Sequence, residues 1–184
     1  MTSVRICDYG AGNTRSVEVA FERLGVDVAV TSDPTAVLDA DLAVLPGVGS
    51  AGSAMARLRA DSLDVALRER VRSGKPTLGI CLGLQLALEE SEEDGGVEGL
   101  GIVPGRAYRL KDARVPRIGW APVEPDGAAF YFAHSYAADT PAATAHSEGI
   151  VAEARHGSFL GVQFHPEKSG PAGARYLARC LSPA

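Results

Sequence analysis

A cysteine with a glycine two residues away on either side ends an apolar run near the middle of the chain. The stretch reads Gly79-Ile80-Cys81-Leu82-Gly83, and the nucleophile elbow of serine hydrolases has the same spacing around serine, G-x-S-x-G. Such an elbow is a sharp strand-to-helix turn, where side chains in place of the two glycines would collide with neighbouring backbone. The pattern predicts a reactive thiol at Cys81; the alternative is one more buried core cysteine.

A thiol nucleophile requires a base, and His165 is the best placed of the four histidines, His134, His146, His156 and His165. It follows an apolar run and therefore stands at the carboxyl edge of a predicted strand, where open α/β sheets place their sites. Glu167 lies two residues further on, beyond a proline that favours extended backbone, so both side chains point the same way. We predict a triad of Cys81, His165 and Glu167. The alternatives are a surface turn with an incidental ion pair, and His134 as the base.

Acyl transfer also needs donors for the developing oxyanion. The amide of Leu82, directly after the nucleophile, is one candidate. The loop Pro46-Gly47-Val48-Gly49 follows a neighbouring predicted strand, and its glycines permit unusual backbone angles. We predict the Val48 amide as the second donor, against the alternative of an ordinary tight turn.

Length and composition limit the class of protein. The 184 residues fit one domain, 1–184, and the formal net charge of -5 provides no basic surface for nucleic acid. No apolar run is long enough to cross a bilayer, and no secretory signal precedes the first strand-like segment. Three widely spaced cysteines favour neither a disulfide framework nor a metal site. We expect a cytoplasmic protein without a metal or cofactor.

Hydrophobic periodicity predicts the elements that position these residues. In the first half, strands alternate with amphipathic helices, which favours a mainly parallel sheet. After the acidic run 89–94 the pattern changes to short extended pieces, for which we expect antiparallel pairing, and a last helix closes the chain. The predicted strands cover 4–7, 28–30, 42–45, 76–80, 100–103, 107–110, 120–123, 130–133, 150–154 and 160–164. The predicted helices carry Val17, Ala20, Phe21 and Leu24 (between Asn13 and Gly25), Leu63, Ala66, Leu67 and Val71 (ending at Gly74), and Tyr176, Leu177, Cys180 and Leu181.

The elbow, together with the stretch Gln163-Phe164-His165-Pro166-Glu167, resembles the triad-type (class I) glutamine amidotransferases. Further stretches resemble one branch, the glutaminase subunits of imidazole glycerol phosphate synthases; they are 8–13, 46–49, 117–120, 131–136 and 165–170. The resemblance implies a three-layer α/β fold, with a mainly parallel central sheet flanked by helices and antiparallel strands in the second half. It also implies glutamine hydrolysis through a cysteine thioester. The ammonia would pass to a (β/α)8-barrel cyclase subunit, the partner in a heterodimer that serves histidine biosynthesis.

Residue roles follow from the resemblance position by position. Cys81 would attack the glutamine amide, His165 would protonate ammonia and then activate water, and Glu167 would orient His165. Residues expected to hold the substrate are Gly49, Gln85, Glu93, His134, Ser135 and Tyr136. Residues expected to face the cyclase are Asn13, Trp120 and Lys168. For these three the residues alone leave other readings open, namely a helix N-cap, a core aromatic and a solvated lysine.

One position departs from the family: Ala121 stands where asparagine usually follows Gly-Trp, which affects a polar contact near the interface but not the triad. Three rivals remain at this level: a γ-glutamyl hydrolase or related thiol peptidase, another amidotransferase such as the pyridoxal phosphate synthase glutaminase, and an inactive regulatory subunit. Glutaminases of this kind are typically nearly silent without their partner. We therefore expect weak activity from the isolated chain.

Overall fold

The computed structural model describes residues 1–10, 13–111 and 115–181 of the chain. Ala11 and Gly12, within the stretch 8–13, lie outside the described residues, as does the end of the predicted domain, 182–184. Among the helices described, none is both long and apolar enough to cross a membrane.

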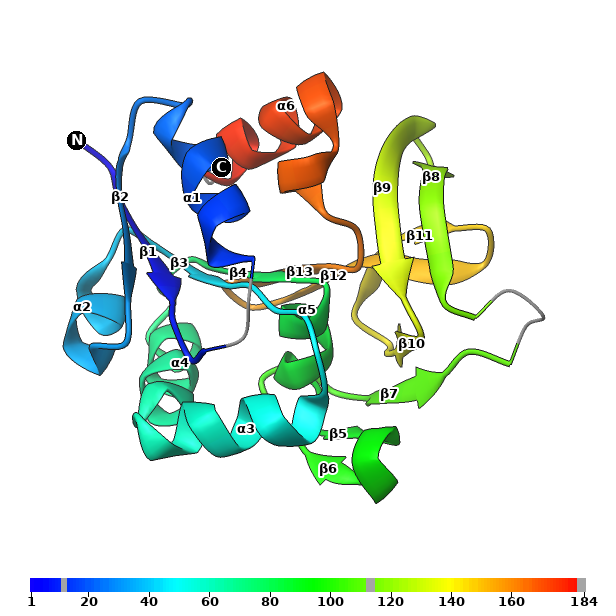
Figure 1. Ribbon diagram of the computed structural model, residues 1–184, viewed down its shortest axis with the longest axis horizontal. Coiled ribbons are helices and arrows are strands. Elements are labelled where there is room, and N and C mark those ends of the chain that lie inside the picture. The colour runs from blue at the N-terminus through cyan, green and yellow to red at the C-terminus, as the bar shows by residue number, and fades with distance from the viewer. Residues whose placement is uncertain (11–12, 112–114, 182–184) are drawn as a thin grey trace.

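A seven-stranded sheet forms the centre of the molecule, in the order β11-β12-β13-β4-β3-β1-β2 (Figure 1). From β13 to β2 all neighbours are parallel, whereas β12 runs antiparallel to both β13 and β11. The predicted mainly parallel sheet with antiparallel strands in the second half is therefore confirmed. Its strands are β1 (Ser3–Cys7), β2 (Asp27–Thr31), β3 (Leu42–Leu45), β4 (Thr77–Ile80), β11 (Ala143–Ser147), β12 (Ile150–His156) and β13 (Phe159–Val162).

Helices cover both faces of this sheet, which gives three layers (Figure 1). Helices α1 and α6 lie on one side and α3, α4 and α5 on the other, with α2 packed on α4. Their apolar faces are buried as the periodicity predicts, with Phe21 of α1 and Leu177 of α6 fully covered. The helices are α1 (Thr14–Glu22), α2 (Pro34–Asp39), α3 (Ala51–Ala60), α4 (Leu63–Arg72), α5 (Leu82–Ala87) and α6 (Gly170–Cys180).

Two of these helices were not predicted because their sequences carry little periodicity. Helix α2 has six residues, and its clearest sequence signal is its start, where the Asp33 side chain accepts from the Thr35 amide at 2.9 Å. Helix α3 is rich in alanine and begins after Ser50, whose hydroxyl accepts from the Ser53 amide. In both cases the N-cap residue was the available signal.

The second half adds a four-stranded sheet, β10-β7-β5-β6, and a hairpin of β8 and β9. The strands are β5 (Glu90–Ser91), β6 (Val97–Glu98), β7 (Arg106–Arg109), β8 (Arg117–Val123), β9 (Ala128–His134) and β10 (Tyr136–Asp139).

The predicted strand at 100–103 is wrong. Its amides instead donate to carbonyls at the end of α5, for example Leu100 to Leu86 at 2.7 Å and Ile102 to Ala87 at 2.9 Å, so the segment satisfies the free end of a short helix.

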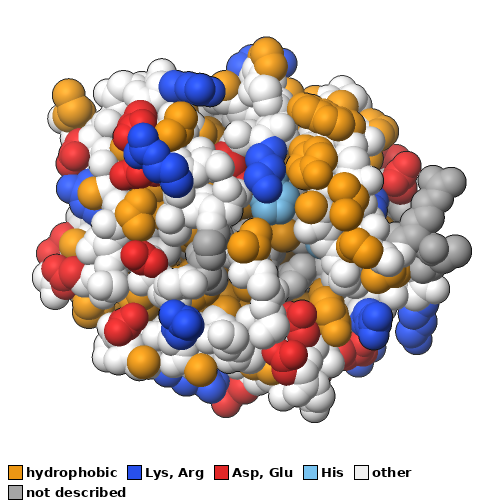
Figure 2. Space-filling model, viewed as in Figure 1, with side chains coloured by type: hydrophobic (Ala, Val, Ile, Leu, Met, Phe, Trp, Pro, Cys, Tyr) orange, Lys and Arg blue, Asp and Glu red, His pale blue; other side chains and the backbone are white. Residues whose placement is uncertain are grey.

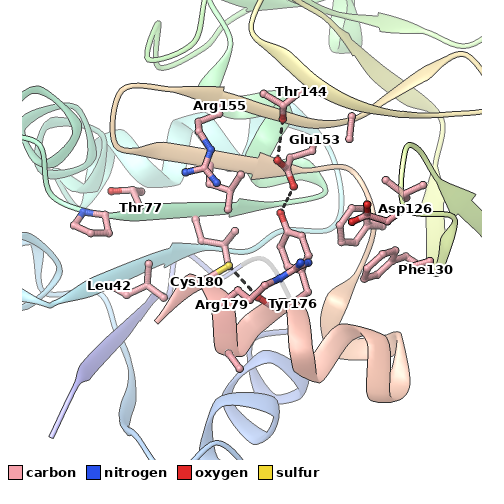
Figure 3. Close-up of a pocket in the computed structure, with 18 of the residues that line it drawn as sticks. Leu42, Thr77, Asp126, Phe130, Thr144, Glu153, Arg155, Tyr176, Arg179 and Cys180 are labelled. Atoms are coloured by element: carbon pink, nitrogen blue, oxygen red, sulfur yellow. Dashed lines mark hydrogen bonds between the residues drawn. The ribbon is translucent and has the colours of Figure 1, made fainter. Parts of the chain in front are cut away.

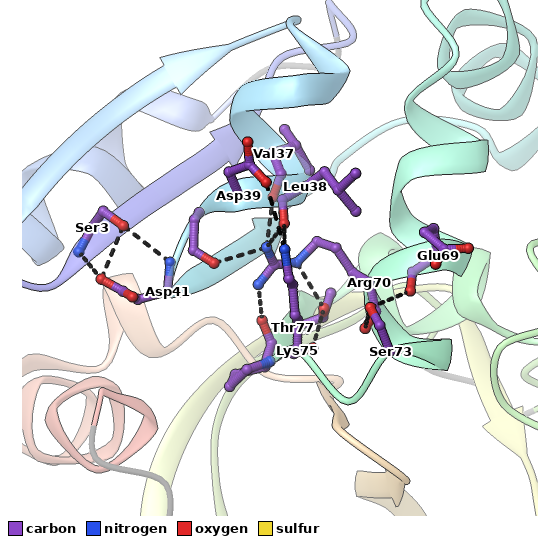
Figure 4. Close-up of polar contacts among 12 residues, drawn as sticks. Ser3, Val37, Leu38, Asp39, Asp41, Glu69, Arg70, Ser73, Lys75 and Thr77 are labelled. Carbon is purple, nitrogen blue, oxygen red and sulfur yellow. Dashed lines mark hydrogen bonds and ion pairs between the residues drawn. The ribbon is translucent and has the colours of Figure 1, made fainter.

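A fully buried arginine joins α2, α4 and β4 (Figure 4). Arg70 of α4 donates through Nη1 to the carbonyls of Val37, Leu38 and Ala40 at 2.7 to 2.9 Å. The guanidinium thereby caps the C-terminal end of α2. Its Nη2 donates to the carbonyl of Pro76 at 2.6 Å and its Nε to the Thr77 hydroxyl at 3.4 Å. Each guanidinium nitrogen therefore has an oxygen acceptor, beside the start of the strand that leads to Cys81.

Candidate active site

Cys81 stands at the turn between β4 and α5, as the elbow pattern predicts. Its backbone angles, φ 53° and ψ -106°, are unusual for a residue with a side chain. A methyl group on Gly83 would overlap the Leu45 carbonyl, and one on Gly79 would lie 2.6 Å from the Phe159 ring. The two glycines therefore allow helix α5 to pack directly on β3 and β4, which holds Cys81 in this conformation.

The base motif lies beside the elbow because β13 is the parallel neighbour of β4. The Cys81 amide donates to the Val162 carbonyl at 2.7 Å, and three residues after Val162 the His165 amide donates to the carbonyl of Tyr131 at 2.8 Å. Nδ1 of His165 lies 2.8 Å from Oε1 of Glu167, and both side chains are buried. Two neighbouring strands, β4 leading into the elbow and β13 leading into the base motif, thus bring together residues 84 positions apart.

His165 is electrostatically prepared to carry a positive charge. Burial alone would lower the pKa of His165, but its interactions with the Cys81 side chain and with Glu167 outweigh burial and raise that pKa to about 9. The imidazole therefore has the proton affinity to accept a proton from a neighbouring thiol. By contrast, burial raises the pKa of the Cys7 and Cys180 thiols to about 12, and both stay protonated near neutral pH.

The other candidate base, His134, has the opposite character. Burial lowers the pKa of His134 to about 4, and the positive charges of Arg117 and His165 act in the same direction. Its Nδ1 lies 2.8 Å from the Tyr136 carbonyl, which can only accept, so Nδ1 carries the proton. Nε2 is buried without a partner in the described part of the chain. A neutral imidazole tied to the backbone fits a lining role better than that of a base.

A cavity of about 320 Å³ opens at Cys81 and gathers nearly all the residues predicted to touch substrate. Three further lining residues were given no role by the sequence. Ile118 and Ala133 lie within the stretches 117–120 and 131–136 that resemble the family, whereas Pro116 lies outside every motif. The lining residues that were predicted are Val48, Gly49, Cys81, Leu82, Gln85, Glu93, His134, Ser135 and Tyr136; their individual roles stay predictions.

Two backbone amides at this cavity have no partner. In the described ranges neither the Val48 nor the Leu82 amide donates a hydrogen bond to another protein group. A methyl group on Gly47 would lie 3.0 Å from Leu82 Cβ, so the loop 46–49 packs against the start of α5. Gly49 adopts φ 102°, which favours glycine. Free donors from two adjacent segments are what an oxyanion site requires.

Glu93 lines the cavity from a short 3-10 turn. Helix α5 stops at Ala87, and Glu93 begins the turn Glu93–Gly95. There Oε2 accepts from the Ala51 amide at 2.9 Å, so Glu93 caps the start of α3. Burial and the nearby Asp94 charge raise the pKa of Glu93, although the Ala51 hydrogen bond opposes them.

The three predicted interface residues lie at or near the surface. Asn13 occupies the N-cap position of α1, but its side chain makes no capping hydrogen bond there, and its Nδ2 donates to Glu167 Oε1 at 2.9 Å. Trp120 is not a core aromatic, because 58% of it is exposed. Lys168 is exposed in the turn after Glu167. Figure 2 shows hydrophobic side chains gathered over the β8–β9 hairpin; exposed hydrophobic residues there include Ile118 and Trp120.

A larger cavity, of about 1100 Å³, lies elsewhere, between α6 and strands β4, β12 and β13 (Figure 3). Glu153 is its central acid and accepts from the Tyr176 and Thr144 hydroxyls. Not one of the predicted site residues lines it. Size alone therefore does not identify the reactive site. Across the described residues, no group of three or more His, Cys, Asp or Glu side chains is arranged to hold a metal ion.

Comparison with known proteins identifies the family. A model of the class I glutamine amidotransferases matches residues 5–183. The chain is 44% identical to imidazole glycerol phosphate synthase subunit HisH of Carboxydothermus hydrogenoformans, over 94% of this chain and 95% of the relative. Identity to the HisH subunit of Methanothermobacter thermautotrophicus is 45%, over 95% of each chain.

Solved structures agree at the level of fold. A crystal structure of a glutamine amidotransferase superposes with a TM-score of 0.78 at 20% identity, over 97% of this chain and 98% of the other. A glutamine amidotransferase from Thermotoga maritima gives a TM-score of 0.67, also at 20% identity, over 97% of this chain and 82% of that one. The chain belongs to the class I glutamine amidotransferases and, within them, to the HisH subunits of imidazole glycerol phosphate synthase.

Proposed function

We propose that this protein hydrolyses glutamine to glutamate and ammonia through a thioester on Cys81. The observation that carries the proposal is the position of His165, which interacts with the Cys81 side chain on one side and Glu167 on the other. Triad chemistry needs a base between nucleophile and carboxylate. The thiol peptidase and inactive-subunit alternatives have no specific support in this chain.

The reaction follows from the proton positions. His165 takes the thiol proton as the sulfur attacks the side-chain amide carbon of glutamine, and it returns that proton to the departing ammonia. The resulting thioester is then attacked by a water molecule that gives a proton to His165, and glutamate leaves as the thiol is restored. In both steps the amides of Val48 and Leu82 stabilise the negatively charged oxygen.

We further propose roles for the cavity wall. The free Gln85 oxygen and the Glu93 carboxylate supply negative polarity for the α-ammonium and amide hydrogens of glutamine, while backbone near Gly49, Ser135 and Tyr136 receives the α-carboxylate. His134 closes the wall as a neutral imidazole. The support is that all six residues line one cavity with Cys81.

The ammonia is proposed to pass to a (β/α)8-barrel cyclase subunit, which uses it to form imidazole glycerol phosphate and AICAR in histidine biosynthesis. The named HisH relatives are subunits of that synthase. Asn13, Trp120 and Lys168 are proposed to face the cyclase. Support comes from the exposure of Trp120 and from the contact of Asn13 with Glu167, which would connect that face to the triad.

The test is ammonia release from glutamine, measured for the chain alone, with the barrel cyclase, and with the cyclase plus its nucleotide substrate. We expect weak release from the chain alone and a rise of at least about a hundredfold with the occupied cyclase, as for a coupling of ~3 kcal/mol. Rapid hydrolysis without any partner would contradict the coupling. Turnover of folate polyglutamate in place of glutamine would identify a γ-glutamyl hydrolase instead.

We also propose that residues 1–184 form one domain located in the cytoplasm. In support, one hydrophobic cluster includes both Cys7 and Phe159, and the cysteines Cys7, Cys81 and Cys180 are free thiols, as a reducing compartment allows. A single unfolding transition, seen alike by tryptophan fluorescence and circular dichroism, is expected. Two separate transitions would argue for two domains.

A further inference from the structure

Two buried side-chain amides connect the cavity wall to the Cys81 sulfur. Gln85 Nε2 donates to the Tyr136 carbonyl at 2.8 Å and to Gln163 Oε1 at 3.1 Å. Gln163 Nε2 in turn lies 3.5 Å from Cys81 Sγ. Gln163 is fully buried and Gln85 is only 6% exposed. Solvent therefore does not compete for these contacts.

The polarity of this chain of hydrogen bonds is fixed at its Tyr136 end. A backbone carbonyl can only accept, so the nitrogen of Gln85 must face it. The same nitrogen meets Gln163, which must therefore present its oxygen there. The nitrogen of Gln163 is left facing the sulfur. Gln163 is thus a donor to Cys81 Sγ and cannot accept the thiol proton.

The backbone places Gln163 directly beside Cys81. Strands β4 and β13 are parallel, with Ile80 opposite Val162, so the residues directly after them lie side by side. The amide of Cys81 donates to the Val162 carbonyl at 2.7 Å, and the amide of Gln163 donates to the Ala152 carbonyl at 2.9 Å. Both residues are therefore anchored by their main chains.

This arrangement has two chemical consequences. A donor aimed at sulfur stabilises the negatively charged thiolate relative to the neutral thiol. In addition, both hydrogens of Gln85 Nε2 are engaged, so its Oε1 is the polar atom left for a ligand. The wall consequently offers an acceptor, which suits an ammonium or amide hydrogen and repels a carboxylate.

We propose that Gln163 is a positioning residue that acts through Cys81 and Gln85: it donates to the sulfur and orients the Gln85 amide with its oxygen free. The substrate part of this inference rests on the proposed glutamine hydrolysis. The sulfur part does not, because alkylation of Cys81 requires neither glutamine nor a partner.

The experiment compares Gln163→Met, which can neither donate nor accept at these positions, with Gln163→Glu, which keeps an acceptor for Gln85 but loses the amide donor. Iodoacetamide alkylation of the full chain is followed by mass spectrometry from pH 5 to 9, where Cys7 and Cys180 remain protonated. We expect the pH of half-maximal Cys81 alkylation to rise by about one to two units in both variants, since a hydrogen bond to a charged group is lost.

Glutamine turnover with the cyclase then separates the two roles. Gln163→Met should raise KM about tenfold and lower kcat, whereas Gln163→Glu should lower kcat with KM within about twofold of wild type, because a hydrogen bond to Gln85 is worth roughly 1 to 1.5 kcal/mol. Thr140→Val is the control: it removes the partly buried hydrogen bond from Thr140 to the Pro104 carbonyl, away from the site. It should lower the melting temperature without moving the alkylation profile.

Unchanged alkylation profiles in folded Gln163→Met and Gln163→Glu would overturn the inference. So would a profile that moves equally in Thr140→Val, because the effect would then be general destabilisation. If the profiles move as expected but the wild-type complex releases no ammonia from glutamine, the proposed function fails while the contact between Gln163 and the sulfur stands.

Discussion

Arg70 with its oxygen acceptors, the Arg70 cluster, and the site around Cys81 both contain buried charged or polar groups. The two regions differ in whether those groups have hydrogen-bond partners. Every nitrogen of the Arg70 guanidinium donates to a protein oxygen (Figure 4). By contrast, His134 Nε2 in the wall of the cavity is buried without a partner among the described residues. The same holds for Oε2 of the triad residue Glu167 and for Nη1 of Arg117, which pairs in register with His134. These three are all the buried unpaired side-chain atoms of the described chain.

The difference separates a stabilising site from a reactive one. An unsatisfied buried polar atom costs about 1 to 3 kcal/mol, and folding alone gives no reason to keep three of them together. Unpaired atoms are useful where a substrate, a product or a partner will supply the missing contact. The Arg70 cluster has no such vacancy, and we expect it to contribute to stability alone.

The largest expected effect tests the reactive side of this comparison. Cys81→Ser should lower ammonia release by the complex by about 10⁴-fold to 10⁶-fold, since the nucleophile is lost, while stability stays within about 0.5 kcal/mol. Steady-state ammonia assays and urea unfolding measure the two quantities. Cys180→Ser, which changes a thiol on α6, is the control and should retain activity. Labelling by a glutamine-like electrophile that persists in Cys81→Ser would show that another residue is the nucleophile.

Glu167→Gln should have the next largest effect, a fall in kcat of about 10² to 10⁴. Loss of the carboxylate charge removes one of the interactions that raise the pKa of His165, so the pH profile of kcat should move to lower pH. Glu153→Gln is a matched control, because Glu153 accepts from Tyr176 in the larger cavity and takes no part in the triad (Figure 3). Equal losses in both variants would count against a special role for Glu167.

Arg70→Met should lose stability rather than chemistry. The change removes the guanidinium donor from the carbonyls of Val37, Leu38, Ala40 and Pro76, and we expect a cost on the order of 3 to 5 kcal/mol in urea unfolding. Arg72→Met, on the exposed side of the same helix, should cost less than about 0.5 kcal/mol. If the folded fraction of Arg70→Met had lost its kcat, the separation between the two regions would not hold.

The smallest expected effects are the pH dependences of stability from two histidines with opposite shifts. The pKa of His165 is raised to about 9, so its contribution is complete below pH 6.5 and is lost as pH rises through 9. The pKa of His134 is lowered to about 4, so its contribution is complete above pH 6.5 and is lost as pH falls through 4. Urea unfolding from pH 4 to 10 should show the alkaline limb flattened in His165→Gln and the acid limb flattened in His134→Gln. The reverse assignment would contradict the geometry.

Sequence alone predicted the features that are determined by neighbouring residues. The elbow at Cys81 and the two-residue spacing of His165 and Glu167 are examples, because each is contained in a short stretch of the chain. The parallel sheet followed from the alternation of apolar runs with helical periodicity. Helices α2 and α3 and strands β10 and β11 escaped notice, because they are short and have weak hydrophobic patterns.

Contacts between distant segments were not predictable in this way. His146 and His156 lie in β11 and β12, although no predicted strand covers either residue. Gln163 is the first residue of the base motif, but no sequence pattern indicated its contact with the sulfur, because that contact depends on the Ile80–Val162 register. The segment 100–103 looked like a strand because its residues are apolar, and only the short end of α5 explains its actual course. These features depend on how strands and helix ends that are distant in the sequence pair with one another, which a local pattern does not contain.

The cap that Glu93 places on α3 has a consequence for observing the protein at work. Its carboxylate holds the Ala51 amide at 2.9 Å, and the neighbouring Asp94 holds the Gly52 amide at 3.0 Å. A cation that binds Glu93 in the cavity will compete with the Ala51 amide for the same charge. Hydrogen–deuterium exchange at Ala51, read against Gly52, will therefore report occupancy of the cavity from a position on the helix outside it.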